Sequence, residues 1–389
     1  MIVAYNALGV RPGVADGGAT FSLNVLRHLP GELPGDRLVI YAQPGETRLP
    51  SGDGRVEVRQ PPAAGRGGAA ARLAAEAIWL GRDLRRVGAS VLIAPTESLP
   101  VATPCPVVVV AQNLVYHRSD EQQTFLGASP RLRLRAKAQA AYYRRRMRSA
   151  YARAAEVVAV SSETARVLEQ RAGLDPGKAT IAHEGADSFL LADPEFAAER
   201  LPSRLLAVAT NAPYKNLDRT IDALRTAHAT NPELTLEIIG SDWHGYRAQL
   251  LQHARVCGVE AQVSFRDPVS PQELVQLYAT SGALVFLSGC ESFGLPLVEA
   301  MRFGLPVVGA ERSSIPEIAG TAALLVDPDD VTATSAAIRR VIGDDELRAS
   351  LVELGYRRAA ELRWQETATH LASAVRRAGG VSPDPTERT

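Results

Sequence analysis

The run Glu291-Ser292-Phe293-Gly294-Leu295-Pro296-Leu297-Val298-Glu299 places two glutamates eight positions apart, between two patterns of different period. An apolar run over residues 282–288 precedes it and predicts a buried strand. A helical pattern starts near Pro296, and proline is favoured in the first turn of a helix. We therefore expect Glu291 in a strand-to-helix loop and Glu299 about one turn into the helix.

The helix N-terminus between these two glutamates is predicted to bind an anion. The first N–H groups of a helix have no partner inside it, and together they carry roughly half a positive charge. Phosphate groups bind at such N-termini. A site with phosphate-binding amides and two carboxylates suits a ligand that has both phosphates and hydroxyls, and a sugar nucleotide is such a ligand.

Short apolar runs alternate with longer helical patterns along the chain. Many of these runs are continuously apolar, which is typical of parallel strands covered by helices on both faces. The predicted strands are 2–8, 37–42, 90–94, 107–112, 156–160, 180–183, 205–209, 235–240, 262–265, 283–288, 306–309 and 323–326. The predicted helices include 19–29, 72–87, 162–171, 216–230, 245–257, 270–280 and 296–303. This alternation predicts an α/β fold with doubly wound parallel sheets.

The length of 389 residues predicts two domains, because single hydrophobic cores stop growing at about 250–300 residues. The alternation restarts near residue 203, after a segment over 187–202 that mixes Pro, Asp and Glu with little periodicity. We interpret this segment as a linker between Rossmann-like domains over 1–190 and 203–360. Ligands bind at the carboxyl ends of the strands in such sheets, so two facing edges would enclose a cleft.

The composition excludes several classes of protein. The 43 basic and 43 acidic side chains give a net charge of zero, which argues against a nucleic-acid-binding protein. The three cysteines are scattered and form no C-x-x-C pair, so we expect a reducing cytosolic compartment with no disulfide framework and no zinc site. No charged segment precedes the first strand, and no apolar run reaches about 18 residues, so we expect neither a signal peptide nor a spanning helix. The tail over 379–389 is expected to be disordered.

Two further loops follow predicted strands. The first ends in Gly17 and Gly18, whose small size allows a ligand close to the backbone, although the spacing is not that of the dinucleotide-binding fingerprint. The alternative is an ordinary turn. The second, Asn211-Ala212-Pro213-Tyr214-Lys215-Asn216-Leu217, places Lys215 at a helix N-terminus, where a cation is disfavoured unless an anion offsets it. A diphosphate would do so; the alternative is a solvated lysine.

His117 closes the run Gln112-Asn113-Leu114-Val115-Tyr116-His117 after another predicted strand. It can hydrogen-bond a sugar hydroxyl or take part in proton transfer, and the alternative is a structural histidine.

Residues 131–153 carry nine basic side chains and no acidic one: Arg131, Arg133, Arg135, Lys137, Arg144, Arg145, Arg146, Arg148 and Arg153. A basic helix can contact anionic lipid or an anionic acceptor, and the alternative is a solvated face.

The chain resembles the family-four retaining glycosyltransferases, which have the GT-B fold. The resemblance covers nearly the whole chain, more weakly in its first half. Besides the Glu291–Glu299 run, it rests on these stretches: Lys215-Asn216-Leu217, Gly304-Leu305-Pro306-Val307-Val308, Pro316-Glu317-Ile318, Asp327-Pro328 and Trp364, which resembles the aromatic residue that marks the last helix. Many relatives carry an arginine shortly before the lysine. Here that stretch reads Ala209-Thr210-Asn211-Ala212-Pro213-Tyr214, which leaves Lys215 as the obvious local cation.

The resemblance implies a role for each matching residue. Glu291 would lie against the donor sugar, Glu299 would bind ribose hydroxyls, and Lys215 would offset the diphosphate. His117 would lie near the donor sugar, and His117, Lys215 and Glu291 would be catalytic. The implied donor site consists of Gly17, Gly18, Asn211, Lys215, Asn216, Arg266, Glu291, Ser292, Phe293, Gly294, Leu295 and Glu299.

The resemblance further implies transfer of a hexose from a nucleoside diphosphate to an acceptor hydroxyl with retained configuration. The sequence has no D-x-D run at a strand end, so no metal and no cofactor are expected. Residues 203–360 would bind the donor and residues 1–190 the acceptor, with a last helix near 362–378 crossing back onto the acceptor domain. The acceptor would be a glycan, a lipid-linked compound or a small molecule, recognised by loops around 60–70 and 118–130.

Two other functions stay open at this point: a sugar-nucleotide epimerase of the same fold, and a non-catalytic sugar-nucleotide-binding subunit of a glycosylation complex. The expected location is the cytoplasm of a bacterium, either free or peripheral on the inner face of the membrane. An Ala- and Arg-rich composition is the basis for the bacterial assignment.

Overall fold

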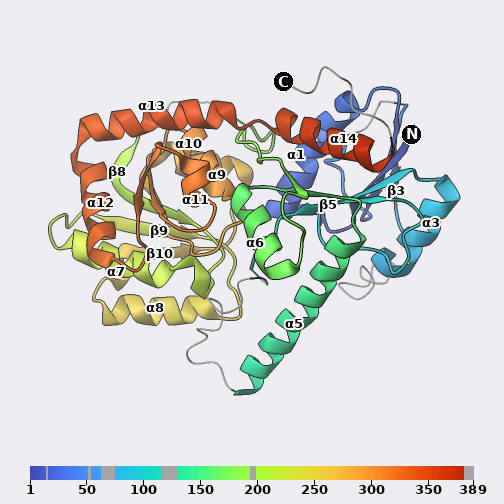
Figure 1. The fold of residues 1–389 in the computed structure, drawn as a ribbon. Helices are drawn as coiled ribbons and strands as arrows, with labels where there is room; N and C mark the ends of the chain where they lie inside the picture. Colours follow the sequence, from blue (N-terminus) through green and yellow to red (C-terminus); the bar gives the residue numbers. More distant parts are fainter. Residues whose placement is uncertain are drawn as a thin grey trace. The chain divides into compact units, whose positions relative to one another are not determined.

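The computed structural model describes residues 1–14, 16–50, 54–62, 75–115, 117, 130–192 and 199–380, with side chains in the segment 130–139 described only at 137 and 138. The chain forms two compact units, each built on its own sheet (Figure 1). The described residues of the first unit lie within Met1–His117, Leu134–Glu184 and Trp364–Gly380, and those of the second lie within Pro130–Arg133 and Gly185–Arg363. Of the loops predicted around 60–70 and 118–130 to recognise the acceptor, residues 63–70 and 118–129 lie outside the described residues.

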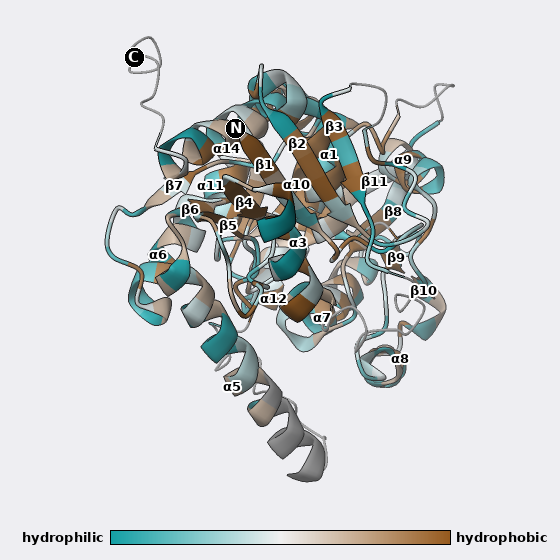
Figure 2. Ribbon diagram, turned by 90° about the vertical axis from the view of Figure 1, so that its right-hand side faces the viewer, coloured by the Kyte–Doolittle hydropathy of each residue, from teal (hydrophilic) through white to brown (hydrophobic). Residues whose placement is uncertain are grey.

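The first unit contains a sheet of seven parallel strands among the described residues, in the order β3-β2-β1-β4-β5-β6-β7. Its strands are β1 (Ile2–Ala7), β2 (Arg37–Ala42), β3 (Val56–Arg59), β4 (Val91–Ala94), β5 (Val107–Ala111), β6 (Glu156–Ala159) and β7 (Ala179–Ile181). The central strands are almost fully buried, as their continuously apolar sequences predict. Figure 2 shows these strands in brown and the surrounding helices with hydrophilic outer faces.

The helices of this unit are α1 (Gly17–Glu32), the π-helix η2 (Ala75–Trp79), α3 (Leu80–Val87), α5 (Pro130–Arg153), α6 (Ser162–Ala172) and α14 (Trp364–Ala378). Helix α14 is last in sequence but packs on α1 and on strands β4 to β7. It begins at Trp364, which is fully buried with its ring edge-on to Phe21 at 5.8 Å. The expectation that Trp364 opens a C-terminal helix of the N-terminal domain is therefore confirmed.

The second unit contains six parallel strands in the order β10-β9-β8-β11-β12-β13 within the described ranges. The strands are β8 (Leu201–Val208), β9 (Thr235–Ile239), β10 (Val263–Arg266), β11 (Ser281–Phe286), β12 (Val307–Ala310) and β13 (Ala323–Val326). The helices are η3 (Pro213–Lys215), α7 (Leu217–His228), α8 (Tyr246–Val256), η4 (Glu260–Gln262), α9 (Pro271–Thr280), α10 (Leu295–Arg302), α11 (Ile315–Ala319), α12 (Val331–Gly343) and α13 (Asp345–Glu361).

The prediction of doubly wound parallel sheets is confirmed, with differences in detail. Strand β3 was not predicted because it lies at the edge of its sheet, where apolar residues alternate with Glu57 and Arg59 instead of forming an apolar run. The helix predicted over 72–87 begins in its described part as a π-helix and continues as α3, a change of period that an apolar pattern does not reveal. Strand β8 starts at Leu201, inside the predicted linker.

Among the described residues, no helix combines the length and the apolar composition needed to cross a bilayer. Helix α5 is long enough, but it is too rich in arginine. Its buried residues Met147, Ala150 and Tyr151 follow the helical period and pack on the first sheet, as does Ala154 directly after its end.

Candidate functional site

The strand order of the second sheet brings two of the predicted loops together. Strands β8 and β11 are neighbours, and the order of the strands reverses between them. Ligands bind in sheets of this kind at the carboxyl ends of the strands beside the reversal. The loop after β8 and the loop after β11 share this edge and are joined by two hydrogen bonds. The Gly289 N–H donates to the Tyr214 carbonyl at 2.8 Å, and Asn216 Nδ2 donates to the Leu287 carbonyl at 2.8 Å.

Lys215 and Glu291 form an ion pair between these two loops. Lys215 Nζ lies 2.5 Å from Glu291 Oε1, and each side chain is 13% exposed. Burial by itself lowers the pKa of Lys215, but the charge of Glu291 and the hydrogen bond between them outweigh burial, so the pKa is raised. Lys215 is therefore cationic at neutral pH. In this structure Glu291 supplies the offsetting negative charge that the sequence led us to expect from a diphosphate.

Hydrogen-bonding groups on the same loops lack an internal partner. Asn211 follows β8 with a fully buried side chain, and neither of its amide atoms has a hydrogen-bond partner among the described residues. Such a group is costly unless a ligand or an ordered water satisfies it. Helix α10 begins after Gly294, which has a φ of 106°, and no side chain caps it. Pro296 has no N–H and the Leu297 N–H donates to the Gly294 carbonyl at 2.9 Å, so this N-terminus offers an anion the positive end of the helix dipole and not a full set of free N–H groups.

The Glu291 loop is held by two serines that the sequence analysis missed. Ser314 is fully buried, and its Oγ lies 3.2 Å from the Glu291 carbonyl oxygen and 3.0 Å from that of Phe293. Ser313 Oγ accepts from the Glu291 N–H at 3.0 Å and lies 2.7 Å from the Glu291 carbonyl oxygen. In a sequence, a Ser-Ser pair shortly before a helical pattern predicts only where the helix begins. Its contact with the Glu291 loop depends on the pairing of β11 with β12.

We expect Ser314→Ala to lower the free energy of unfolding by about 1–3 kcal/mol, because the Phe293 carbonyl oxygen loses this buried donor, whereas the Glu291 carbonyl oxygen keeps Ser313. Urea unfolding of the variant and the wild type measures this difference. Ser149 is exposed on α5, and Ser149→Ala serves as the control, with an expected change within about 0.5 kcal/mol. Equal unfolding midpoints for the two variants would show that the loop does not depend on Ser314.

Glu299 lies in α10 with its carboxyl group buried. Its Oε2 accepts a hydrogen bond from the Tyr278 hydroxyl at 2.9 Å. Burial raises the pKa of Glu299 to about 7, against the lowering effects of the Tyr278 hydrogen bond and the charge of Arg302. One carboxylate oxygen is thus bonded within the unit. The role of Glu299 toward ribose stays a prediction.

The raised pKa makes the contribution of Glu299 to stability depend on pH. The folded-state pKa of about 7 lies above the ordinary value of 4.5, so the folded protein retains a proton that the unfolded chain releases. The stabilisation from Glu299 is complete below the ordinary pKa of 4.5. It is lost as the pH rises through the folded-state pKa of about 7. We expect the stability of Glu299→Gln relative to wild type to increase from about pH 5 to about pH 8. Urea unfolding of both proteins at each pH tests this, and a constant difference would contradict it.

The other predicted donor residues of this unit have structural partners as well. Arg266 ends β10 and forms ion pairs with Glu237, at 3.1 Å, and with Glu273. Strand β9 separates β10 from β8, so Arg266 lies further along the sheet edge than Lys215. Ser292, Phe293 and Leu295 complete the turn into α10; the Phe293 ring is buried, and Leu295 is the first residue of the helix.

Gly17 and Gly18 begin helix α1 in the first unit, on the loop after β1. The Asp16 carboxylate caps this helix by accepting from the Ala19 N–H at 2.9 Å. A β-carbon at Gly17 would meet no atom within 4 Å, so the packing of the described residues does not require glycine there. Open space beside the backbone is what a closely bound ligand needs, and the role of the two glycines toward the donor stays a prediction.

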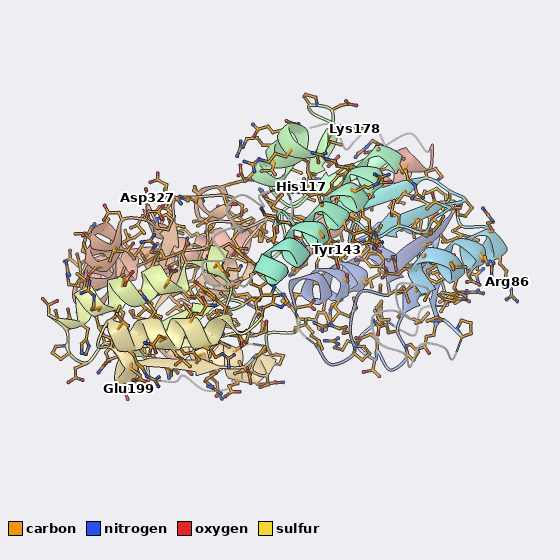
Figure 3. The ribbon with its side chains drawn as sticks, turned by 90° about the horizontal axis from the view of Figure 1, so that it is seen from below. Arg86, His117, Tyr143, Lys178, Glu199 and Asp327 are labelled. Atoms are coloured by element: carbon orange, nitrogen blue, oxygen red, sulfur yellow. The ribbon has the colours of Figure 1, made fainter. Side chains whose placement is uncertain are left out.

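His117 follows β5 and lies beside helix α5 (Figure 3). His117 is 5% exposed, and neither ring nitrogen has a hydrogen-bond partner among the described residues. Burial, together with three nearby arginines, lowers the pKa of His117 to about 4, so the ring is neutral at physiological pH. A neutral imidazole can both donate and accept a hydrogen bond, and a sugar hydroxyl would satisfy it.

Glu97 is a further residue that the sequence did not point to. It follows β4, the strand beside the reversal in the first sheet, and its carboxylate accepts from the Tyr151 hydroxyl at 3.0 Å. Burial raises the pKa of Glu97 to about 7. The Tyr151 ring lies 6.1 Å from the ring of His117, so Glu97, Tyr151 and His117 form one cluster at this sheet edge. The stretch Pro95-Thr96-Glu97 resembles an ordinary turn, and only the fold places it next to β5.

Comparison with known families identifies both halves of the chain. Residues 195–358 match the family described as Glycosyl transferases group 1, and residues 15–188 match Glycosyltransferase Family 4. The chain belongs to the family-four glycosyltransferases. This family-four chain is 31% identical over 172 residues to the O-antigen chain mannosyltransferase B of Escherichia coli, which covers 44% of this chain and 45% of that protein. It spans about half the length of the curated relatives it matches.

Two solved structures show the same fold over almost the whole family-four chain. Sucrose-phosphate synthase of Thermosynechococcus elongatus superposes with a TM-score of 0.76 at 17% identity, covering 98% of this chain and 100% of the other. HepE of Anabaena, in complex with UDP and glucose, superposes with a TM-score of 0.67 at 19% identity, covering 96% and 98%. The predicted GT-B fold class is confirmed.

Proposed function

We propose that the protein transfers a hexose from a nucleoside diphosphate to an acceptor hydroxyl, with retention at the anomeric carbon and without a metal ion at the reacting centre. The observation that carries this proposal is the Lys215–Glu291 ion pair beside the uncapped N-terminus of α10. Both lie on loops that flank the strand reversal of the second sheet, where ligands of such sheets bind.

The chemistry rests on the positive charge that these loops present. In the proposed step the bond between the anomeric carbon and the diphosphate oxygen breaks, and negative charge develops on the leaving diphosphate. Lys215 and the positive end of the α10 dipole stabilise that charge. The acceptor oxygen bonds to the anomeric carbon on the same face, and its proton passes to the departing diphosphate. Glu291, released from Lys215 by the phosphates, accepts hydrogen bonds from the sugar hydroxyls.

The relatives suggest which donors to test first. The Escherichia coli relative is a mannosyltransferase, and HepE was solved with UDP and glucose. We therefore infer a hexose donor, with uridine diphosphate as the first carrier to test and guanosine and thymidine diphosphate as the other two candidates. A glycan, a lipid-linked compound or a small molecule is the proposed acceptor.

A donor panel tests this proposal. The protein is incubated with uridine, guanosine and thymidine diphosphate hexoses, with and without a panel of glycan and lipid acceptors, and free nucleotide is measured. Nucleotide release that depends on an acceptor, unchanged by EDTA, with an α-linked product from an α-linked donor by NMR, is the expected result. Isomerisation of the donor alone would show an epimerase, and binding without turnover would show a non-catalytic subunit.

We further propose peripheral contact with an anionic membrane through α5. Fewer of its basic residues would take part than the sequence indicated. Arg146 donates to Ser98, Arg148 to the Arg171 carbonyl and Arg153 to the Pro100 carbonyl. These three arginines hold the helix within the first unit. Lys137, Arg145 and Tyr142 are exposed and form the part of the helix that would meet lipid headgroups.

We expect Lys137→Gln combined with Arg145→Gln to weaken binding to vesicles that contain phosphatidylglycerol by roughly 30-fold, because each of the two cations contributes about 1 kcal/mol near an anionic surface. Vesicle sedimentation measures this effect. Exposed Arg86 and Lys178, far from α5 in sequence, supply the matched control variant Arg86→Gln with Lys178→Gln. Equal binding by both variants, or no binding by wild type, would contradict membrane contact through α5.

A further inference from the structure

Three side chains of different chemistry converge on the outer helices of the second unit. Asp222 lies in α7, His253 lies in α8 and Cys257 caps the C-terminus of α8. Helices α7 and α8 run side by side (Figure 1). His253 and Cys257 are four positions apart, a spacing that places both side chains on one face of a helix. Here that face is turned to α7, because both side chains reach Asp222.

The three potential ligand atoms lie close to one another. His253 Nε2 is 2.9 Å from Asp222 Oδ1, Cys257 Sγ is 3.4 Å from the same oxygen, and the sulfur is 3.7 Å from Nε2. A tetrahedral zinc ion with bonds of about 2.0–2.3 Å separates its nitrogen, oxygen and sulfur ligands by roughly 3.3–3.6 Å. The observed separations bracket this range, so small side-chain rotations would place all three atoms around one ion.

We propose that Asp222, His253 and Cys257 bind a divalent transition metal ion, with zinc preferred, at a structural site that links α7 to α8. Imidazole, thiolate and carboxylate are the three ligand types that zinc accepts in proteins. A thiolate and a carboxylate together neutralise the two charges of the ion. This site is separate from the donor chemistry proposed above and does not depend on it.

The surroundings of the cluster permit an ion to enter. The side chain of His253 is 35% exposed and that of Asp222 is 22% exposed, so water can reach the fourth coordination position. Cys257 is a half-buried free thiol, and burial and Asp222 raise its pKa in the metal-free protein. Binding therefore requires loss of the thiol proton, and the Asp222–His253 hydrogen bond is exchanged for two bonds to the metal. The positive charge of Arg225, also on α7, lies near Cys257 and repels a metal ion.

Cobalt(II) provides a direct probe, because it binds at zinc sites and thiolate ligation produces a charge-transfer band in the near ultraviolet. The full chain, stripped with EDTA and reduced, is titrated with cobalt(II), and zinc(II) is then added. We expect a charge-transfer band that saturates at one equivalent and disappears when zinc(II) is added. Zinc(II) is also expected to raise the melting temperature of the wild type by mass action.

Matched variants locate the site. Cys257→Ser and His253→Ala are expected to lose the band and the zinc-dependent rise in melting temperature. Cys105→Ser removes the other half-buried thiol and is expected to keep both. Melting curves without metal establish that each variant is folded. Absence of the band in wild type, its persistence in Cys257→Ser, or its loss in Cys105→Ser would overturn the proposal. None of these results depends on sugar transfer, so the outcome is independent of the proposed function.

Discussion

Lys215→Met is expected to lower the rate of sugar transfer by about 10²–10³-fold, the effect of removing one group that stabilises developing negative charge. Methionine keeps the length and apolar stem of lysine but removes the charge. The same change leaves Glu291 without its cation in a site where both side chains are 13% exposed. Breaking a buried ion pair in this way costs about 3–5 kcal/mol of stability, so transfer and unfolding are measured together.

A double variant separates the two effects. Lys215→Met combined with Glu291→Gln removes both charges, and we expect it to recover much of the lost stability because no unpaired charge stays buried. The transfer rate is expected to stay as low as in the single variant. Rates at saturating donor and urea unfolding provide the two measurements. A double variant that transfers sugar at the wild-type rate would remove Lys215 from the mechanism.

Glu291→Gln is the second change with a large expected effect, a fall of about 10²-fold in transfer. Glutamine keeps the shape of the side chain but no longer offsets the charge of Lys215. The lysine is then free for a diphosphate, so we expect the affinity for the free nucleoside diphosphate to be unchanged or increased. Titration calorimetry measures that affinity, and acceptor-dependent nucleotide release measures transfer.

Glu311 supplies the matched control for this experiment. It is an exposed glutamate directly after β12, and Glu311→Gln is expected to change neither binding nor transfer. If nucleotide affinity in Glu291→Gln fell as far as the transfer rate, Glu291 would bind the nucleotide and not the sugar. Wild-type transfer in Glu291→Gln would exclude Glu291 from the site.

The secondary structure could be predicted largely because it depends on neighbouring residues. Continuously apolar runs such as 107–111, within the strand predicted over 107–112, correspond to buried parallel strands, here β5, because both faces of the sheet are covered. The same rule overlooked β3, an edge strand whose sequence alternates. It also could not anticipate the π-helical turn Ala75–Trp79, because the apolar spacing of a π-helix and an α-helix differs too little over five residues.

The sequence by itself determined the fold class, the family and the two loops that follow β8 and β11, because local periodicity and short motifs carry this information. The tertiary structure alone decided which side chains those loops bring into contact. It paired Lys215 with Glu291, which are 76 positions apart, and it set Ser314 against the Glu291 loop. It also brought Asp222 to His253 and Cys257, where the cysteine spacing had indicated no zinc site. Contacts between distant segments depend on strand order and helix packing, and no local pattern specifies them.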